Sequence, residues 1–387
     1  MRPMNKADSC GKNVSSLVLL AKRPGRTSFS SLFSVKHALG TKKVGHTGTL
    51  DSFAEGLLVV CTGALTRIAS RITAFDKEYE AIIAFGTETD TLDPYGAAVR
   101  TAPLPSKESF IDAFNAFKGE LMQKPPAFSA LHVDGQRASD LARKGIEVEV
   151  PERKITVFSS SIKEIQEKDG LVEYAHVVFH VSKGTYIRSL ARDIAASCGS
   201  AAHLIGLRRT KVGSFRLEDA AGYELLEPFS IKTVQNVRNI KNNEKGEKIE
   251  IYDNIQNAQI TKNQQNQQNR PKEQNIQNLP KEQIVKNTQN DQFIQSEILK
   301  KLRSMTPEVA VECGFTPTFL KDGYVEWFFH GKPLSEKIFN KFPADGNEYA
   351  VFTGNAEECE DSKNCKFVGM VERKGRFLKY GFVINDL

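Results

Sequence analysis

The sequence predicts an α+β fold, with a mixed or antiparallel sheet flanked by helices and a small second domain that is rich in β-structure. Apolar residues alternate with others over 79–85, which is typical of a strand. Apolar residues recur at helical spacing over 110–117. Strands and helices do not follow the regular rhythm of βαβ units, which favours α+β over a parallel α/β fold. A chain of 387 residues is long enough for two domains with separate cores.

The first domain is expected over residues 14–234, after a polar start at 1–13 that we expect to be disordered. A Pro24-Gly25 turn separates its first strand from its first helix. The predicted elements, in chain order, are a strand at 16–20, a helix over 31–39, a strand over 79–85, a helix over 110–117 that ends by Gly119, a strand over 176–181 and a helix through 190–194.

A low-complexity segment follows at 235–297. It is dominated by Asn, Gln, Lys and Glu, and the sequence Pro-Lys-Glu-Gln starts at both 271 and 280. It carries too little apolar surface to offset the entropy lost on ordering, so we expect disorder to about residue 295. A passive linker or insertion is the preferred interpretation, although such tracts can also bind RNA or self-associate.

The last segment, 298–387, is expected to form the small β-rich domain. Aromatic and β-branched residues cluster there between glycine-containing turns, which is typical of short strands. The predicted strands lie at 324–329, 349–353, 367–371 and 380–383.

The overall composition is that of a soluble globular protein with a small excess of positive charge. The net charge of +6 and the isoelectric point near 8.8 favour a polyanionic partner only mildly. The six cysteines include no pair at zinc or redox spacing, so idle thiols in a reducing compartment are expected. No segment approaches the length of a membrane span and no signal peptide is recognisable, so we expect a cytoplasmic protein with no membrane partner.

The loop at residues 45–58 is the strongest candidate for a functional site. It sets one acid, Asp51, among glycines and hydroxyl residues, between a basic lead-in and an apolar run. The glycines at 45 and 48 allow unusual backbone conformations and close approach of a ligand. Glu55 lies four residues further on, so a carboxylate pair in a hydrolytic base-removing enzyme is an alternative. If this stretch is helical, Glu55 faces solvent, which weakens that alternative.

Other motifs follow this loop in a recognisable order. The positions in the pattern are Lys22, Thr27-Ser28, Gly45 to Asp51, Lys77 to Tyr79, Gly86 to Gly96, Pro125-Pro126, Ser129-Ala130, Gly135, Arg137, Ala142-Arg143, Gly145, Lys183 to Arg188 and Leu207 to Arg209. Over about residues 14–230 this pattern resembles the TruB family of tRNA pseudouridine synthases. Residues 367–370 more weakly resemble the PUA-like C-terminal domain of bacterial members.

The resemblance implies that the protein isomerises uridine to pseudouridine in the T-loop of tRNA, at position 55. The glycosidic bond would break, the base would turn, and a new bond would join C5 to the ribose C1′. Asp51 would be the catalytic carboxylate, either attacking C1′ or removing a ribose proton, with Arg188 as its partner and Tyr79 stacked on the flipped base. The implied substrate-binding residues are His46, Tyr186 and Leu207. The reaction requires no cofactor and no metal.

The resemblance also implies the partners. These would be the T-stem and loop of tRNA, with no guide RNA and no obligatory protein partner, and the enzyme would be a monomer. A non-catalytic RNA-binding or tRNA-folding module remains an alternative. The basic residues expected to contact phosphates are Lys42, Lys43, Arg67, Arg71, Arg208, Arg209 and Lys211.

The chain departs from the family pattern at a few positions. Ser52 replaces the proline that usually follows the catalytic acid, so the loop is expected to be less rigid there. The usual Asp-Lys-Pro-x-Gly reads Ala-Lys-Arg-Pro-Gly over 21–25. His132 and Ser139 stand where a lysine and a tyrosine are common. None of these changes removes a proposed catalytic residue.

Overall fold

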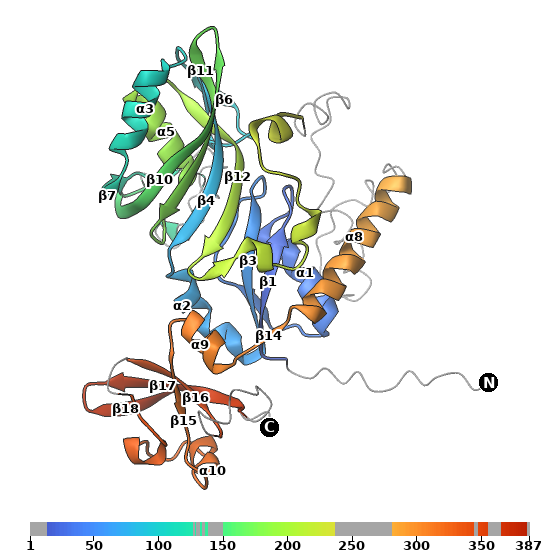
Figure 1. Ribbon diagram of the computed structural model, residues 1–387, viewed down its shortest axis with the longest axis vertical. Helices are drawn as coiled ribbons and strands as arrows, with labels where there is room; N and C mark the ends of the chain where they lie inside the picture. Colours follow the sequence, from blue (N-terminus) through green and yellow to red (C-terminus); the bar gives the residue numbers. More distant parts are fainter. Residues whose placement is uncertain are drawn as a thin grey trace, which may run out of the picture.

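The computed structural model describes residues 14–126, 128, 132–133, 136–137, 150–236, 281–343, 347–354 and 365–384. The expectations for residues 1–13, for most of the Asn/Gln-rich segment and for motif positions such as Gly135 and Gly145 lie outside the described residues. Within the described part, a large sheet with its helices forms one body, and the small C-terminal domain lies at one end of it (Figure 1).

The large sheet has ten strands, in the order β14-β1-β3-β12-β4-β11-β10-β7, with β2 beside β3 and β13 beside β12. Neighbouring strands are antiparallel except β3 and β12, which are parallel. The predicted α+β class is confirmed, as are the strands expected near 16–20, 79–85 and 176–181. The strands are β1 (Ser16–Lys22), β2 (Val44–His46), β3 (Glu55–Thr62), β4 (Lys77–Phe85), β7 (Gly119–Gln123), β10 (Arg153–Lys168), β11 (Leu171–Val181), β12 (Ala202–Val212), β13 (Phe215–Arg216) and β14 (Arg303–Ser304).

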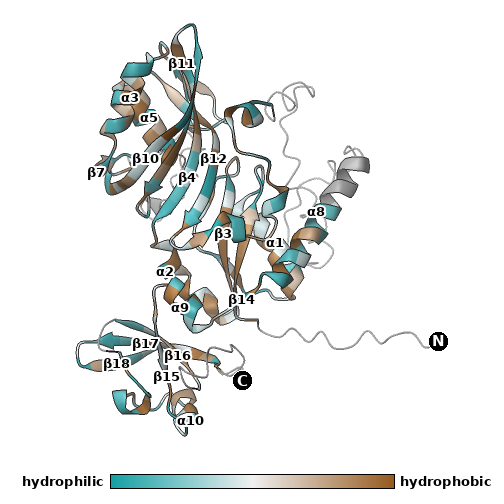
Figure 2. Ribbon diagram, in the orientation of Figure 1, coloured by the Kyte–Doolittle hydropathy of each residue, from teal (hydrophilic) through white to brown (hydrophobic). Residues whose placement is uncertain are grey.

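Strands β1 and β3 are buried on both faces, and all of their residues are buried. Because successive side chains of a strand point to opposite faces, Leu17 and Leu57 join one hydrophobic cluster, whereas Val18 and Leu58 join another. Figure 2 shows the resulting hydrophobic colouring of both strands. The loop with Asp51 leads directly into β3, so this apolar centre gives it a rigid base.

Helices cover both sides of the sheet. The predicted helices over 110–117 and through 190–194 are α3 and α5, which pack with β4 and β11 in one core cluster. Helix α1 begins at Ser28, three residues before the predicted start, because the Thr27 side chain caps it by accepting a hydrogen bond from Ser30 N at 3.0 Å. The helices of this body include α1 (Ser28–Leu39), α2 (Ala69–Thr73), α3 (Lys107–Ala116), α5 (Ile187–Ser197) and α8 (Lys281–Lys300). Short elements connect them: η1 (Gly63–Ile68), β5 (Thr87–Thr89), β6 (Ala98–Thr101), β8 (His132–Val133), β9 (Gln136–Arg137), η2 (Leu217–Asp219) and η3 (Tyr223–Leu225).

The C-terminal domain is a four-stranded sheet in the order β15-β16-β17-β18. The strands expected at 349–353, 367–371 and 380–383 are confirmed. The strand predicted at 324–329 is wrong: this stretch is a helix, in which Tyr324 and Phe328 are one turn apart and Phe328 is fully buried. The elements are α9 (Pro307–Glu312), β15 (Thr316–Phe319), α10 (Val325–Phe329), η5 (Glu336–Ile338), β16 (Glu348–Phe352), β17 (Phe367–Lys374) and β18 (Phe377–Val383).

Two arginines that we expected to bind phosphates join the two domains. Arg71 forms an ion pair with Glu348 and donates a hydrogen bond to Gly314 O at 2.7 Å. The Arg67 guanidinium lies over the Phe382 ring, 5.2 Å from its centroid. Both side chains therefore stabilise the orientation of the C-terminal domain, and their contact with phosphates stays a prediction.

The disorder expected up to about residue 295 is also wrong from Lys281 onward, where helix α8 begins. Ile294 and Ile298 are buried in one cluster with Leu32 and Val35 of α1. Two isoleucines four residues apart thus supply the apolar face that the Asn/Gln-rich composition concealed.

The cysteines only partly match the expectation of idle thiols. Cys61 and Cys313 are buried and free, and burial raises the pKa of each to about 12. Cys198 is free and half-buried, whereas Cys365 is disulfide-bonded, contrary to the expectation. No helix among the described residues is both long and apolar enough to cross a membrane.

Candidate functional site

The Asp51 loop is held from the side of β1 and α1 by hydrogen bonds to its main chain. The Ser28 hydroxyl donates to Leu50 O at 3.0 Å and accepts from Leu50 N at 2.8 Å. Gly25 N donates to Ser52 O at 2.7 Å. These bonds involve the residues on both sides of Asp51, so the loop is constrained without the proline that is missing at position 52.

Lys22 is a support of the loop to which the sequence alone assigned no role. Its side chain is 1% exposed, and Nζ donates to Ala54 O at 2.5 Å and to Ser52 O at 3.4 Å. Burial lowers the pKa of Lys22 to about 7, against the opposing effect of the Asp51 and Glu55 carboxylates. A polar residue at the end of a fully buried strand was the signal that could have identified it.

Arg209 holds the other side of the loop. Its side chain donates to Leu57 O at 2.8 Å and to Gly48 O at 3.1 Å, and the residue is 2% exposed. Its guanidinium is therefore an internal anchor, and the expectation that Arg209 contacts phosphates is wrong.

Glu55 is buried. We had expected it to face solvent if this stretch were helical, but the stretch is not a helix. Glu55 begins β3 and pairs with Arg208, whose Nε lies 2.7 Å from Oε1. Arg208 is thereby withdrawn from the predicted phosphate contacts, because it is buried in this pair. Lys211 pairs with Glu78 at 3.0 Å, and its contact with a phosphate stays a prediction. Of the predicted phosphate-binding residues, Lys42, Lys43 and Arg67 are exposed.

Asp51 lies against Arg188, which is in the first turn of α5. Arg188 Nε is 2.9 Å from Asp51 Oδ2 as an ion pair, and Nη2 donates a hydrogen bond to Oδ1 at 3.2 Å. The Arg188 side chain is 5% exposed, whereas 36% of the Asp51 side chain remains open to solvent. The arrangement presents a guanidinium-bound carboxylate to an incoming ligand.

Arg188 is itself fixed by the 86–96 segment, which belongs to the sequence pattern but in which no site residue was predicted. Nη1 donates to Thr91 O at 2.7 Å and lies 3.8 Å from the Asp93 carboxylate. Leu92, between them, has a φ of 58°, an uncommon and strained conformation for a leucine, and its side chain is buried. The alternation of Thr and Asp in this segment was the available signal for a site residue at Asp93.

The electrostatics of Asp51 are a balance between burial and charge. Burial raises the pKa of the Asp51 carboxyl above its ordinary 3.8, Arg188 opposes this rise, and Asp93 adds to it. Because the carboxylate must be ionised to act as a nucleophile or base, activity is expected to fall as the pH is lowered through this raised pKa.

In Arg188→Met the opposing charge is lost, so the pKa of Asp51 rises further. When the single-turnover rate is plotted against pH, the acid limb is then expected to move to higher pH. The rate at neutral pH is expected to fall at least about 10²-fold. Arg188→Lys keeps the charge and should give an intermediate shift. If the acid limb of the rate–pH profile of Arg188→Met lies at the same pH as in the wild type, Arg188 does not control the ionisation of Asp51.

Two of the predicted residues, Tyr79 on β4 and Leu207 on β12, lie in the core cluster next to the loop. Leu207 belongs to the cluster that contains Leu50 and Phe53, and the half-buried Tyr79 packs against it. The structure thus places both side chains in or against the cluster that contains Leu50 and Phe53 from the Asp51 loop.

Tyr186 is the N-cap residue of α5, two positions before Arg188. Its amide donates to Gln123 Oε1 at 2.9 Å, and the Arg153 guanidinium lies 4.5 Å from the ring centroid. The ring therefore lies beside the same helix terminus that carries Arg188.

His46 ends β2 at the other end of the loop, where its Nδ1 accepts a weak hydrogen bond from Gly48 N at 3.4 Å. Burial and the nearby Arg209 lower the pKa of His46, so its ring is neutral at pH 7. A neutral ring suits stacking among bases better than pairing with a phosphate.

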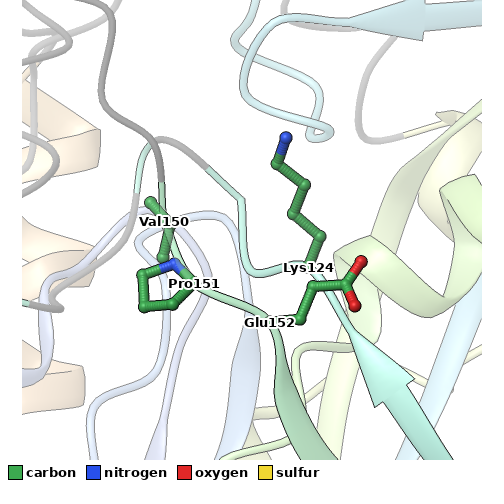
Figure 3. Close-up of a pocket in the computed structure, with 4 residues that line it drawn as sticks. All are labelled: Lys124, Val150, Pro151 and Glu152. Carbon is green, nitrogen blue, oxygen red and sulfur yellow. The ribbon is translucent and has the colours of Figure 1, made fainter.

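A surface cavity of about 420 Å³ lies beside α5 and is lined by Lys124, Val150, Pro151 and Glu152. Figure 3 shows the Lys124 side chain extending on the side opposite Val150 and Pro151. Lys124 O accepts a hydrogen bond from Ser189 Oγ at 3.0 Å, which connects the rim of this cavity to the helix of Arg188. Among the described residues no cluster of His, Cys, Asp and Glu is arranged to bind a metal ion.

Comparison with known proteins adds the family context. The sequence signature of the "TruB family pseudouridylate synthase (N terminal domain)" matches residues 36–187. The chain is 50% identical over 233 residues to a tRNA pseudouridine synthase B of Treponema denticola, which covers 56% of this chain and 65% of that protein. It is 43% identical over 220 residues to a tRNA pseudouridine synthase B of Borreliella burgdorferi, with 57% of this chain and 77% of that protein covered. The chain therefore spans slightly less than two thirds of the first of these relatives.

Among solved structures, one chain of a Cbf5-Nop10-Gar1 complex superimposes with a TM-score of 0.53. The match covers 95% of this chain and 84% of that chain at 20% sequence identity. At this identity the likeness shows a shared fold alone.

Proposed function

Because the chain belongs to the TruB family of pseudouridylate synthases, we propose that it isomerises uridine to pseudouridine in the T-loop of tRNA, at position 55. The observation that carries the proposal is the ion pair between Asp51 and Arg188 in the family loop, with the carboxylate partly open to solvent. The curated relatives named tRNA pseudouridine synthase B support tRNA as the substrate.

In the proposed reaction, the target uridine leaves the RNA stack and enters the site beside Asp51. Unstacking costs a few kcal/mol, and stacking on an aromatic ring such as Tyr79 returns about 1–3 kcal/mol per base. His46, as a neutral ring, would occupy the space that the base vacates. Tyr186 and Leu207 would line the base pocket and exclude water while the base is detached.

Asp51 then acts on the ribose, either by attack at C1′ or by removal of a ribose proton. The detached uracil turns, and its C5 bonds to C1′, after which the C5 proton is lost. Every heavy atom of the base is kept, N1 takes up a proton from solvent as the C5 proton is lost, and there is no net oxidation or reduction, so the chemistry requires a positioned carboxylate and a closed pocket. We propose that no cofactor or metal takes part.

The alternatives gain less support from the structure. In a hydrolytic enzyme of the two-carboxylate type, Glu55 would have to act as an acid, but it is buried and paired with Arg208. A module that only binds RNA gives no reason for a carboxylate held in place by an arginine. We therefore propose a monomeric enzyme that acts without guide RNA or protein partner, in the cytoplasm, where we expect it to meet its tRNA.

The function is tested with tRNA that carries tritium at uridine C5. The purified protein alone is expected to release one equivalent of tritium per tRNA, and release should vanish when position 55 is cytidine. Release that persists with cytidine at 55 would contradict the assigned position. Free uracil with an abasic tRNA would favour hydrolysis. If tritium is released only after another RNA or protein is added, the stand-alone enzyme is contradicted.

A further inference from the structure

Helix α8 lies outside the stretch that matches the family signature, yet it is docked on the catalytic domain. Its Ile294 and Ile298 are buried with residues of α1, the helix that starts directly after the Pro24-Gly25 turn. Figure 1 shows α8 running alongside α1. This packing fixes which side chains of α8 can reach the turn.

Asp291, one turn before Ile294, faces two arginines that flank this turn. Its Oδ1 is 3.2 Å from Nη2 of Arg26 and 3.8 Å from Nη2 of Arg23. The side chains of Arg26, Arg23 and Asp291 are 11%, 15% and 27% exposed, so water and salt screen these pairs less than pairs on an open surface. Arg26 Nε is buried and makes no hydrogen bond with the described residues, which leaves Asp291 as the carboxylate that holds this guanidinium.

The Pro24-Gly25 turn also supports the Asp51 loop. Gly25, which directly precedes Arg26, donates its amide hydrogen to Ser52 O at 2.7 Å. Lys22, which directly precedes Arg23, donates to Ala54 O at 2.5 Å. Each arginine that pairs with Asp291 is thus adjacent in sequence to a residue that anchors the loop.

We propose that Asp291 is a positioning residue for the reaction: its ion pairs with Arg23 and Arg26 keep the turn, and through it the Asp51 loop, aligned with Arg188. The proposal rests on the proposed function of Asp51. The loop lacks the proline that would stiffen it at Ser52, and α8 supplies the constraint from outside the catalytic sequence.

The test is Asp291→Asn, which removes the charge and keeps the size of the side chain. The single-turnover rate constant for tritium release is expected to fall about five- to tenfold, with the Kd for tRNA changed by less than about twofold. The acid limb of the rate profile should move to higher pH, because Asp51 would lose alignment with Arg188, which lowers its pKa, while Asp93, which raises its pKa, stays beside it. A loss of folded protein alone would not move this limb.

Matched variants separate the ion pairs from a general effect on α8. Asp291→Glu should restore the rate, Arg26→Met should reproduce the loss, and the double variant should be no slower than either single variant. Gln292→Ala, at the exposed neighbouring position, should behave as wild type.

Amide hydrogen exchange tests the same proposal independently of activity. In Asp291→Asn, peptides that cover Gly25 and residues 50–54 are expected to exchange faster, whereas Gln292→Ala should leave them unchanged. If the wild type forms no pseudouridine, the proposed function fails, and exchange still decides whether Asp291 constrains the loop. Wild-type rate and exchange in Asp291→Asn, or an effect confined to tRNA binding, would overturn the proposal.

Discussion

Asp51→Asn is expected to abolish pseudouridine formation, with a loss of at least about 10³-fold in the single-turnover rate. An amide can neither attack C1′ nor accept a ribose proton, but it fills the same volume and can still accept a hydrogen bond from Arg188. Burial raises the pKa of Asp51, so ionisation of this carboxyl is less favourable in the folded protein than in the unfolded chain. At pH 7 the ionised carboxylate therefore costs stability, and the neutral variant should unfold at no lower temperature.

The measurement is tritium release from C5-labelled tRNA, combined with thermal unfolding of the same preparation. Asp112→Asn is a suitable control, because Asp112 is an exposed acid on α3. The substitution makes the same chemical change away from the site. We expect it to retain wild-type activity. Pseudouridine formation by folded Asp51→Asn at more than about a tenth of the wild-type rate would exclude Asp51 as the catalytic carboxylate.

Gly56→Ala is expected to lower the free energy of unfolding by about 3–5 kcal/mol. Gly56 has a φ of 112°, and a Cβ there would lie 2.4 Å from the carbonyl oxygen and 2.6 Å from the nitrogen of Arg209. Both contacts are with main-chain atoms of β12, the parallel partner of β3, so a side-chain rotation cannot relieve them. The strands must separate at the point where Arg209 holds the Asp51 loop.

Gly170→Ala is the matched control for this change. Gly170 also has a positive φ, 78°, in the turn between β10 and β11, but a Cβ there would meet no atom within 4 Å. It should therefore lose only about 1 kcal/mol, the cost of the left-handed conformation. Denaturant unfolding of both variants separates the contact with β12 from backbone strain. Equal losses in the two variants would contradict the close approach of β3 and β12.

Local sequence patterns predicted the elements whose residues fit a single period. The alternation over 79–85 and the helical spacing over 110–117 were confirmed as β4 and α3, because each pattern reflects one buried face. The aromatic run at 324–329 carries strong β-propensity, but Val325, Phe328 and Phe329, at helical spacing, pack into one cluster and the stretch is a helix. Propensity is a weak guide when tertiary packing selects which side chains are buried.

The role of α8 could not be read from the sequence for a related reason. The composition around it predicts disorder, and the helix is held by two isoleucines and one aspartate that find partners on α1 and on the turn before it. Asp291 and Arg26 are 265 positions apart, a separation across which no local pattern carries information.

By itself the sequence determined the fold class and the loop that carries Asp51, and by resemblance it indicated Arg188, 137 positions away, as the partner of this carboxylate. Only the tertiary structure decided how the other charges are used. It paired Glu55 with Arg208, turned Arg209 inward to the loop and placed Arg67 and Arg71 between the domains. The physical reason is that the type of a charged residue does not reveal its environment. A guanidinium can bind a phosphate, a carboxylate or a carbonyl, and burial and distance select among them.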